Sequence, residues 1–172
     1  MTIKFNDLNA QWKIIKNDCL KEFEVLFEKS NFILGQQVSE FEKLFAKYVG
    51  TKYAIGVSNG TSALKLSAMS LSLNEEETCF VLPALTYIAT IGGIEQAYPR
   101  SKYKLIDCDE YFQMDVKELE KFVASNRKRY KDMVIVPVHL FGYACDMKKI
   151  CEIAEKNNCL LLEDASQAHG AK

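Results

Sequence analysis

Two adjacent acids, Glu163 and Asp164, follow the apolar run of residues 159–162. Successive side chains of a strand point to opposite faces, so the two carboxylates would leave the strand on different sides. A carboxylate at the end of a buried strand is unfavourable unless it has a cationic partner. A protonated pyridine nitrogen would be such a partner, and the acid would keep the ring able to accept electrons from a carbanion. Gln167 could form a hydrogen bond with another substituent of that ring. The alternative is a satisfied strand-end acid that caps the next turn.

The stretch "SNGTSAL", residues 58–64, has the residue types of an anion site. It follows a predicted strand and opens a predicted helix, where free backbone N–H groups and the helix dipole favour a phosphate. Gly60 would allow a tight turn and a close approach of the ligand, and Thr61 and Ser62 would add two hydroxyls. An ordinary Asn-Gly turn with a threonine cap is the alternative. The stretch is neither a Walker loop nor G-x-G-x-x-G, so a nucleotide-binding fold is not indicated.

Tyr87, in "PALTYIAT", follows the next predicted strand and could stack on a planar ring held beside the phosphate. Its alternative role is packing on the core at the start of a helix. We interpret the two histidines, His139 and His169, as structural rather than catalytic, although His139 follows a strand and so lies near the same cleft. Neither lies near a cysteine pair with zinc-ligand spacing, and we expect no metal site.

These candidate residues depend on an alternation of strands and helices that begins near residue 53. Five apolar runs are predicted as strands, at residues 53–58, 79–83, 103–109, 132–138 and 159–163. Helical patterns separate them, and we expect a capping box of Asp115 with Glu118 in one helix and an Asp146 cap in another. Continuous apolar strands alternating with helices indicate an α/β fold with a mainly parallel sheet covered by helices on both faces. Ligands of such sheets bind beyond the carboxyl ends of the strands.

Residues 1–50 form a separate helical segment in this interpretation, followed by an α/β domain at residues 51–172. Apolar residues recur every three or four positions from Leu8 to Leu26 and again from Val38 to Tyr48, after which Gly50 is expected to end the helix. Both apolar faces could pack on a core or on a partner subunit.

The composition argues against several classes of protein. Lys plus Arg number 22 and Asp plus Glu 23, for a net charge of -1, so nucleic acid is not an expected partner despite the run "NRKRYK". No stretch has the ~18 apolar residues that a membrane span needs, and the N-terminus has no signal-peptide core. The 6 cysteines show no C-x-x-C spacing, and we expect a reducing, cytoplasmic compartment.

Together, these residues resemble the DegT/DnrJ/EryC1/StrS family of sugar aminotransferases, pyridoxal-phosphate (PLP) enzymes of the aspartate-aminotransferase fold type. The resemblance runs from about Phe32 to the last residue, over the motifs "FILGQQVSEFEKLFAKYVGTKYAIGVSNGTSAL", "VLPALTYIAT", "VPVHLFGYACDM" and "LLLEDASQAHGA". It implies that the PLP phosphate binds at Gly60, Thr61 and Ser62. It further implies that Tyr87 stacks on the ring, that Asp164 pairs with the ring nitrogen and that Gln167 lies near the ring hydroxyl.

The resemblance also implies partners and a setting. Family substrates are nucleotide-linked keto-sugars, and glutamate is the common amino donor. The enzymes are usually homodimers that serve amino-sugar and surface-polysaccharide biosynthesis. A PLP-dependent sugar dehydratase of the same fold, a non-catalytic remnant and a binding module are the alternatives.

One residue of the family is not matched. The lysine that forms the Schiff base with PLP lies beyond the "EDASQAHGA" motif in the family, and Lys172 is too close to Asp164 to be that lysine. We therefore expect no catalytic residue in this chain. We expect the N-terminal part of such an enzyme, with an incomplete large domain, no C-terminal small domain and no activity by itself.

Overall fold

The computed structural model describes residues 4–171, and their contacts divide the chain after Gly56 into two compact units. The first unit contains helices α1 (Leu8–Lys29) and α2 (Gln36–Val49). α1 contributes no buried residue, and large apolar side chains are exposed along it. Gly50 ends α2 in the left-handed conformation, with a φ of 82°, as the sequence predicts. None of the helices in the described residues combines the length and the apolarity that a membrane crossing requires.

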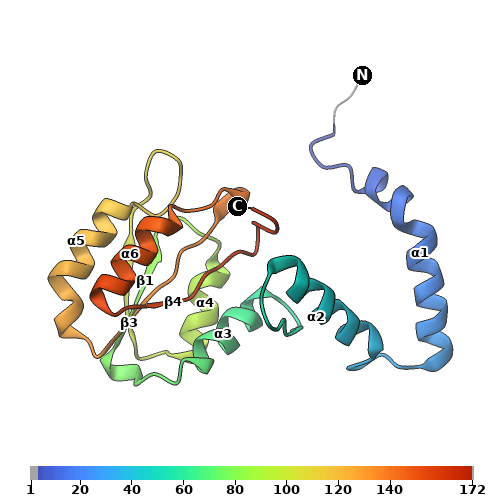
Figure 1. Ribbon diagram of the computed structural model, residues 1–172, viewed down its shortest axis with the longest axis horizontal. Helices are drawn as coiled ribbons and strands as arrows, with labels where there is room; N and C mark the ends of the chain where they lie inside the picture. The colour runs from blue at the N-terminus through green and yellow to red at the C-terminus, as the bar shows by residue number, and fades with distance from the viewer. Residues whose placement is uncertain (1–3, 172) are drawn as a thin grey trace. The chain divides into compact units, whose positions relative to one another are not determined.

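The second unit is built on a four-stranded parallel sheet in the order β2-β1-β3-β4. Figure 1 shows strands β1, β3 and β4 among the helices of this unit. The strands are β1 (Thr78–Pro83), β2 (Lys102–Ile106), β3 (Asp132–Ile135) and β4 (Leu160–Leu161). β1 lies between two neighbours and is buried along its whole length, which explains its nearly continuous apolar sequence. A parallel bridge between Val138 and Asp164 continues the pairing of the β3 and β4 segments past the end of β4.

Helices cover both faces of this sheet, so the predicted α/β fold class is confirmed. Phe80 and Leu82 of β1 point into a core shared with α3 and α4, whereas Cys79 and Val81 point into a second core shared with α5 and α6. The alternation of side chains along one strand therefore supplies two separate apolar layers. The four helices are α3 (Gly60–Ser70), α4 (Ile88–Ala97), α5 (Val116–Asn126) and α6 (Met147–Asn157).

The strand predicted at residues 53–58 is not present, and this prediction is wrong for the described chain. The segment has no strand conformation, and the side chains of Tyr53 and Ile55 are 71% and 82% exposed. A β-strand depends on hydrogen bonds to a neighbouring strand, and no strand of the described residues pairs with this segment. The residues of this segment have a high propensity for strands, but a strand forms only where another strand of the fold pairs with it.

The predicted helix caps are present, with one difference. The Asp115 carboxylate accepts hydrogen bonds of 2.7 and 3.1 Å from two amides at the start of α5, and Asp146 accepts one of 3.2 Å from the Lys149 amide. Glu118 does not complete a capping box, because the Asp115 amide donates to the carbonyl of Asp107 instead. The Glu118 carboxylate accepts from the Asp107 amide at 3.0 Å, which fastens α5 to the residue after β2.

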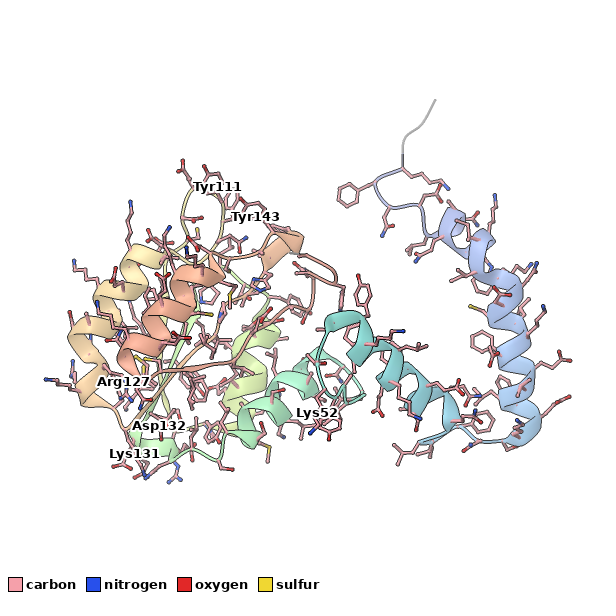
Figure 2. The ribbon with its side chains drawn as sticks, in the orientation of Figure 1. Lys52, Tyr111, Arg127, Lys131, Asp132 and Tyr143 are labelled. Carbon is pink, nitrogen blue, oxygen red and sulfur yellow. The ribbon has the colours of Figure 1, made fainter. Side chains whose placement is uncertain are left out.

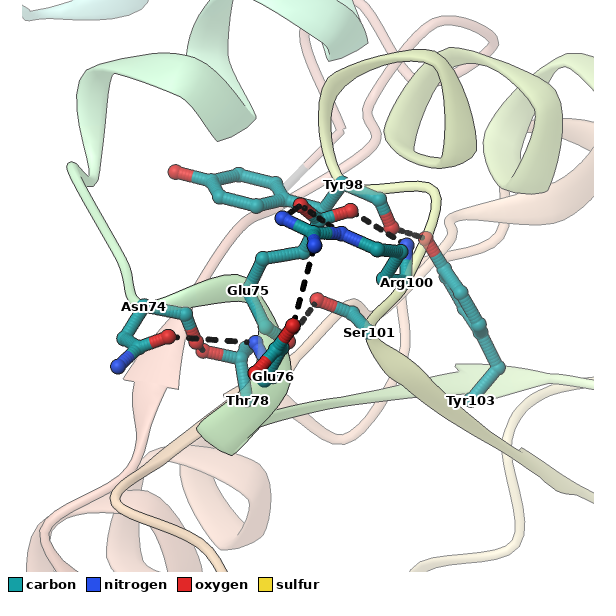
Figure 3. A network of polar contacts seen from close by, with 8 residues as sticks. All are labelled: Asn74, Glu75, Glu76, Thr78, Tyr98, Arg100, Ser101 and Tyr103. Atoms are coloured by element: carbon teal, nitrogen blue, oxygen red, sulfur yellow. Dashed lines mark hydrogen bonds and ion pairs between the residues drawn. The ribbon is translucent and has the colours of Figure 1, made fainter.

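A polar network joins the amino ends of β1 and β2 (Figure 3). Arg100, in the turn before β2, donates from its guanidinium to Glu75 at 3.0 and 3.1 Å and to Glu76 at 3.0 Å. The Ser101 hydroxyl donates to the carbonyl of Glu75 at 2.9 Å. The backbone amide and the guanidinium of Arg100 lower the pKa of the Glu75 carboxyl. Because η1 (Glu75–Glu77) leads directly into β1, these bonds hold the starts of the two strands together.

Arg127 has a similar role at the amino ends of β3 and β4. Its guanidinium donates to four backbone carbonyls, at distances of 2.7 to 3.2 Å, in Tyr130, Lys131, Asn157 and Asn158. Figure 2 shows Arg127, Lys131 and Asp132 together at one end of the unit. These bonds join the end of α6 to the loop that enters β3.

Candidate functional site

The described residues enclose a cavity of about 370 Å³ at the carboxyl ends of the strands. Its walls come from the start of α3, the turn between β1 and α4, the residues that follow β3 and the turn after β4. Five of the six residues predicted to bind a cofactor line it: Gly60, Thr61, Tyr87, Asp164 and Gln167. Ser62 is not among the lining residues.

One end of the cavity carries free backbone donors. Asn59 caps α3, because its Oδ1 accepts from the Ser62 amide at 2.8 Å and its carbonyl accepts from the Ala63 amide at 3.0 Å. The two preceding amides, of Gly60 and Thr61, have no acceptor within the described residues. Free amides at the N-terminus of a helix, beside the Thr61 hydroxyl, suit an anionic group such as a phosphate.

Gly60 and Ser62 contribute to this end in ways that the sequence did not reveal. The Ser62 hydroxyl lies 3.1 Å from the Ser58 hydroxyl, so Ser62 braces the turn. Gly60 is not in the left-handed region, so no tight turn requires a glycine there. A Cβ atom on Gly60 would instead lie 3.8 Å from Oγ of Ser166, another lining residue. The glycine therefore keeps open the space between α3 and the turn after β4.

The carboxylate of Asp164 forms another wall of the cavity and is only 7% exposed. Oδ2 accepts a hydrogen bond of 2.8 Å from the Thr90 hydroxyl. Oδ1 accepts from the hydroxyl and the amide of Ser166, at 2.6 and 3.2 Å. These donors are neutral, and no ion pair joins Asp164 to a Lys, Arg or His of residues 4–171. A buried carboxylate without a cationic partner suits a ligand with a positively charged N–H group.

Gln167 has one side-chain atom bonded and one available. Its Oε1 accepts a hydrogen bond of 2.7 Å from the backbone amide of Phe141. Because the side-chain oxygen already accepts this bond within the protein, the two N–H donors of the Gln167 amide remain for a ligand. Gln167 can therefore act as a hydrogen-bond donor in the cavity that it lines.

Tyr87 lies at the first residue before α4, and its side chain is 71% exposed. Packing on the core, the alternative role for this residue, is therefore not what the structure shows. Leu64 and Val138 supply apolar walls nearby. An exposed aromatic ring at the edge of such a cavity can stack on a planar ligand.

His139 also lines the cavity, as its position after a strand suggested. Its Nδ1 accepts from the Cys145 amide at 3.1 Å, so the ring proton is on Nε2, which lies 2.9 Å from Oε1 of Glu163. His169 is not among the lining residues.

The sequence interpretation missed three hydroxyl residues of the cavity, Thr86, Thr90 and Ser166. The four-residue spacing of Thr86 and Thr90 at a helix start was a signal that could have found two of them, since such residues share one face of a helix. Ser166 lies in the segment after Asp164 and could have been predicted to form a local turn with that carboxylate.

The donor set of this cavity fits pyridoxal phosphate. Free amides at Gly60 and Thr61 suit its phosphate, and the exposed ring of Tyr87 suits the face of its heterocycle. The carboxylate of Asp164 suits the ring nitrogen, and the free amide N–H groups of Gln167 suit the ring hydroxyl.

Residues 13–172 match the DegT/DnrJ/EryC1/StrS aminotransferase family. GDP-perosamine synthase of Caulobacter vibrioides is 39% identical over 139 residues, which cover 80% of this chain and 35% of that protein. The dTDP-3-amino-3,6-dideoxy-alpha-D-galactopyranose transaminase of Aneurinibacillus thermoaerophilus is 38% identical over 171 residues, 98% of this chain and 45% of that protein.

A solved structure gives the same result. A DegT DnrJ EryC1 StrS aminotransferase from Brucella abortus matches with a TM-score of 0.87 and 32% identity, over 97% of this chain and 45% of that one. The chain spans less than half the length of the curated relatives it matches. It belongs to the DegT/DnrJ/EryC1/StrS aminotransferase family of PLP-dependent enzymes.

Proposed function

We propose that this chain forms the PLP-binding part of an aminotransferase that moves an amino group from an amino acid such as glutamate to a nucleotide-linked keto-sugar. The observation that carries the proposal is one cavity lined both by the free amides of α3 and by the buried carboxylate of Asp164. Either feature alone has an ordinary structural explanation, as a helix start or as a satisfied acid. Together in one cavity, the amides match the phosphate of PLP, Asp164 matches its ring nitrogen, and Tyr87 at the edge matches the face of its ring.

Different residues would bind the phosphate and the ring of the cofactor. Gly60 and Thr61 would bind the phosphate through their amides, and Ser62 would support them by bracing the turn with Ser58. Tyr87 would stack on the heterocycle. These contacts orient the cofactor and restrict its rotation, which is the contribution that a protein makes to a cofactor-dependent reaction.

PLP, when bound, supplies an electron-withdrawing ring that stabilises a carbanion next to an amine. Asp164 would hold a proton on the ring nitrogen, because a buried carboxylate stabilises a neighbouring cation. Gln167 would donate to the ring hydroxyl from the N–H groups that Phe141 leaves free. The apolar side chains of Leu64 and Val138 would strengthen these interactions by excluding water.

Aminotransfer by this family also requires a lysine that bonds covalently to the cofactor. No lysine lines the cavity in the described residues, and Lys172 lies outside them. We propose that this lysine is not among residues 4–171 and that the 172 residues alone bind PLP without turning over substrate.

The substrate, donor and setting of the whole enzyme rest on the family. The two curated relatives are named for GDP-linked and dTDP-linked sugars, and a nucleotide-linked keto-sugar is therefore the proposed acceptor. We place the reaction in the cytoplasm, in amino-sugar and surface-polysaccharide biosynthesis. A homodimer is the proposed assembly, with the exposed apolar side chains of α1 and α2 as candidates for its interface.

Equilibrium dialysis of the purified chain against PLP tests the cofactor site. Wild type is expected to bind one PLP per chain, and Asp164→Ala is expected to lose most of the affinity. Glu163→Gln is the matched control, because it neutralises the adjacent acid and keeps an acceptor for His139. Equal affinity of wild type and Asp164→Ala would refute the site. Formation of an amino-sugar by these residues with PLP, glutamate and keto-sugar acceptors would refute the proposed inactivity.

A further inference from the structure

Two threonine hydroxyls form a hydrogen-bonded chain that ends on the acid of the cavity. Oγ1 of Thr86 lies 2.8 Å from Oγ1 of Thr90, and Oγ1 of Thr90 lies 2.8 Å from Oδ2 of Asp164. Thr90 is 1% exposed, so water does not compete for its hydroxyl. Thr86 lines the cavity, so the chain begins and ends at residues that a bound ligand can reach.

The chemistry of the groups sets the direction of this chain. An ionised carboxylate only accepts hydrogen bonds, so the single proton of the Thr90 hydroxyl is donated to Asp164. The Thr90 oxygen then accepts from Thr86, which must be the donor of the second bond. A hydroxyl that accepts one hydrogen bond becomes a stronger donor in the next, so Thr86 strengthens the bond from Thr90 to the carboxylate.

The bonds around Asp164 leave room for one more partner. A carboxylate has about four lone-pair positions, and Thr90 and Ser166 fill three of them. Ser166 is two residues away on the same turn, whereas Thr90 belongs to a helix 74 positions earlier in the chain. Thr90 is therefore the contact that fixes the carboxylate relative to another wall of the cavity.

The first turn of α4 also sets the position of the aromatic residue. Tyr87 is the N-cap residue of α4, and its carbonyl accepts a hydrogen bond of 3.0 Å from the Thr90 amide. Through its amide and its hydroxyl, Thr90 joins the residue expected to stack on the ring to the residue expected to pair with the ring nitrogen. The first turn of α4 thus fixes the positions of Tyr87 and Asp164 relative to each other, and both are expected to contact the same planar ligand.

We propose that Thr90, assisted by Thr86, is a positioning residue that holds the Asp164 carboxylate oriented toward a cationic ring N–H. This inference rests on the proposed PLP site and deepens it. Thr90 acts through Asp164 and does not need to touch the cofactor. The expectation is that removing the hydroxyl weakens both PLP binding and protonation of the ring nitrogen, while a serine at the same position preserves both.

Thr90→Val and Thr90→Ser, in the purified chain, form a matched pair that tests the proposal. Valine has nearly the shape of threonine without the hydroxyl, and serine keeps the hydroxyl. Loss of a hydrogen bond to a charged group predicts a rise of about tenfold in the PLP dissociation constant for Thr90→Val, and Thr90→Ser should remain close to wild type. The 15N chemical shift of the ring nitrogen in labelled PLP should move toward the unprotonated value in Thr90→Val alone.

A second pair of variants, at Thr86, tests the proposal if substitution of the buried Thr90 prevents folding. Thr86 is only partly buried, and Thr86→Val is expected to raise the dissociation constant by about threefold relative to Thr86→Ser. Equal affinities and equal 15N shifts within the Thr90 pair would overturn the inference and leave the PLP site intact. If Thr90→Val does not fold, equality within the Thr86 pair overturns it instead. Absence of PLP binding to wild type would refute the site itself, and the inference with it.

Discussion

The side-chain oxygen of Gln167 accepts a 2.7 Å hydrogen bond from the backbone amide of Phe141, a residue with a φ of 59°. A large side chain in the left-handed region is unfavourable by about 1 kcal/mol or more, so the turn depends on contacts of this kind. Gln167 therefore supports the turn, and its proposed role toward a ligand can be tested separately.

Replacement of Gln167 by Glu should separate these functions. A carboxylate still accepts from the Phe141 amide but cannot donate to a ring hydroxyl, so PLP affinity should fall about tenfold while stability changes little. Gln167→Leu removes both roles and should also lower the free energy of unfolding by about 1 kcal/mol. Equilibrium dialysis and urea unfolding of both variants provide the check. Unchanged PLP affinity in Gln167→Glu would contradict the assigned donor role.

Gly60→Ala should reduce PLP affinity without destabilising the fold. A Cβ there has ordinary contacts and no left-handed strain, so the free energy of unfolding should stay within about 0.5 kcal/mol of wild type. The added methyl group would occupy space between α3 and Ser166, in the cavity where the phosphate is proposed to bind.

Gly92→Ala is the control for that substitution. Gly92 lies inside α4, and a Cβ there would meet nothing within 4 Å. An alanine should stabilise the helix by about 0.5–1 kcal/mol and leave PLP binding unchanged. A loss of PLP affinity in both alanine variants would indicate a general effect rather than a phosphate site.

Arg127→Ala should destabilise the second unit by about 2 kcal/mol, because several carbonyls lose a charged donor. Arg127→Lys should recover only part of this loss, since an ammonium cannot reproduce the planar arrangement of guanidinium donors. Chemical denaturation monitored by circular dichroism measures the effect. Lys128→Ala, at the exposed neighbouring residue, is the control and should be within about 0.5 kcal/mol of wild type. Equal stability of Arg127→Ala and Lys128→Ala would show that the hydrogen bonds of the Arg127 guanidinium do not stabilise the unit.

Stability should fall at alkaline pH, and Cys79 should contribute to the fall. Burial of this thiol raises its pKa from 9.0 to about 11. The folded state therefore keeps a proton that the unfolded state releases, so the stabilising contribution is complete below pH 9 and is lost as the pH rises to about 11. Urea unfolding from pH 8 to pH 11 should show a smaller decline in Cys79→Val than in wild type. Parallel declines would rule out this contribution.

Much of the second unit follows from short-range patterns. Buried strands have continuous apolar sequences, helices have a repeat of three to four residues, and caps such as Asp115 and Asp146 lie within a few residues of the amides they bond. The same patterns placed Asp164 and Tyr87 at the carboxyl side of their strands, because a parallel sheet puts all those ends on one edge.

The tertiary structure decided the rest. The segment at residues 53–58 has the composition of a strand, yet no strand of the described residues pairs with it. Thr90 bonds Asp164 across 74 positions, and Gln167 uses its oxygen on Phe141, 26 positions away. Residue types and spacing carry information about neighbours along the chain, because they report local backbone geometry. Hydrogen bonds between distant segments depend on how the helices and strands pack, and only the folded chain brings those atoms together.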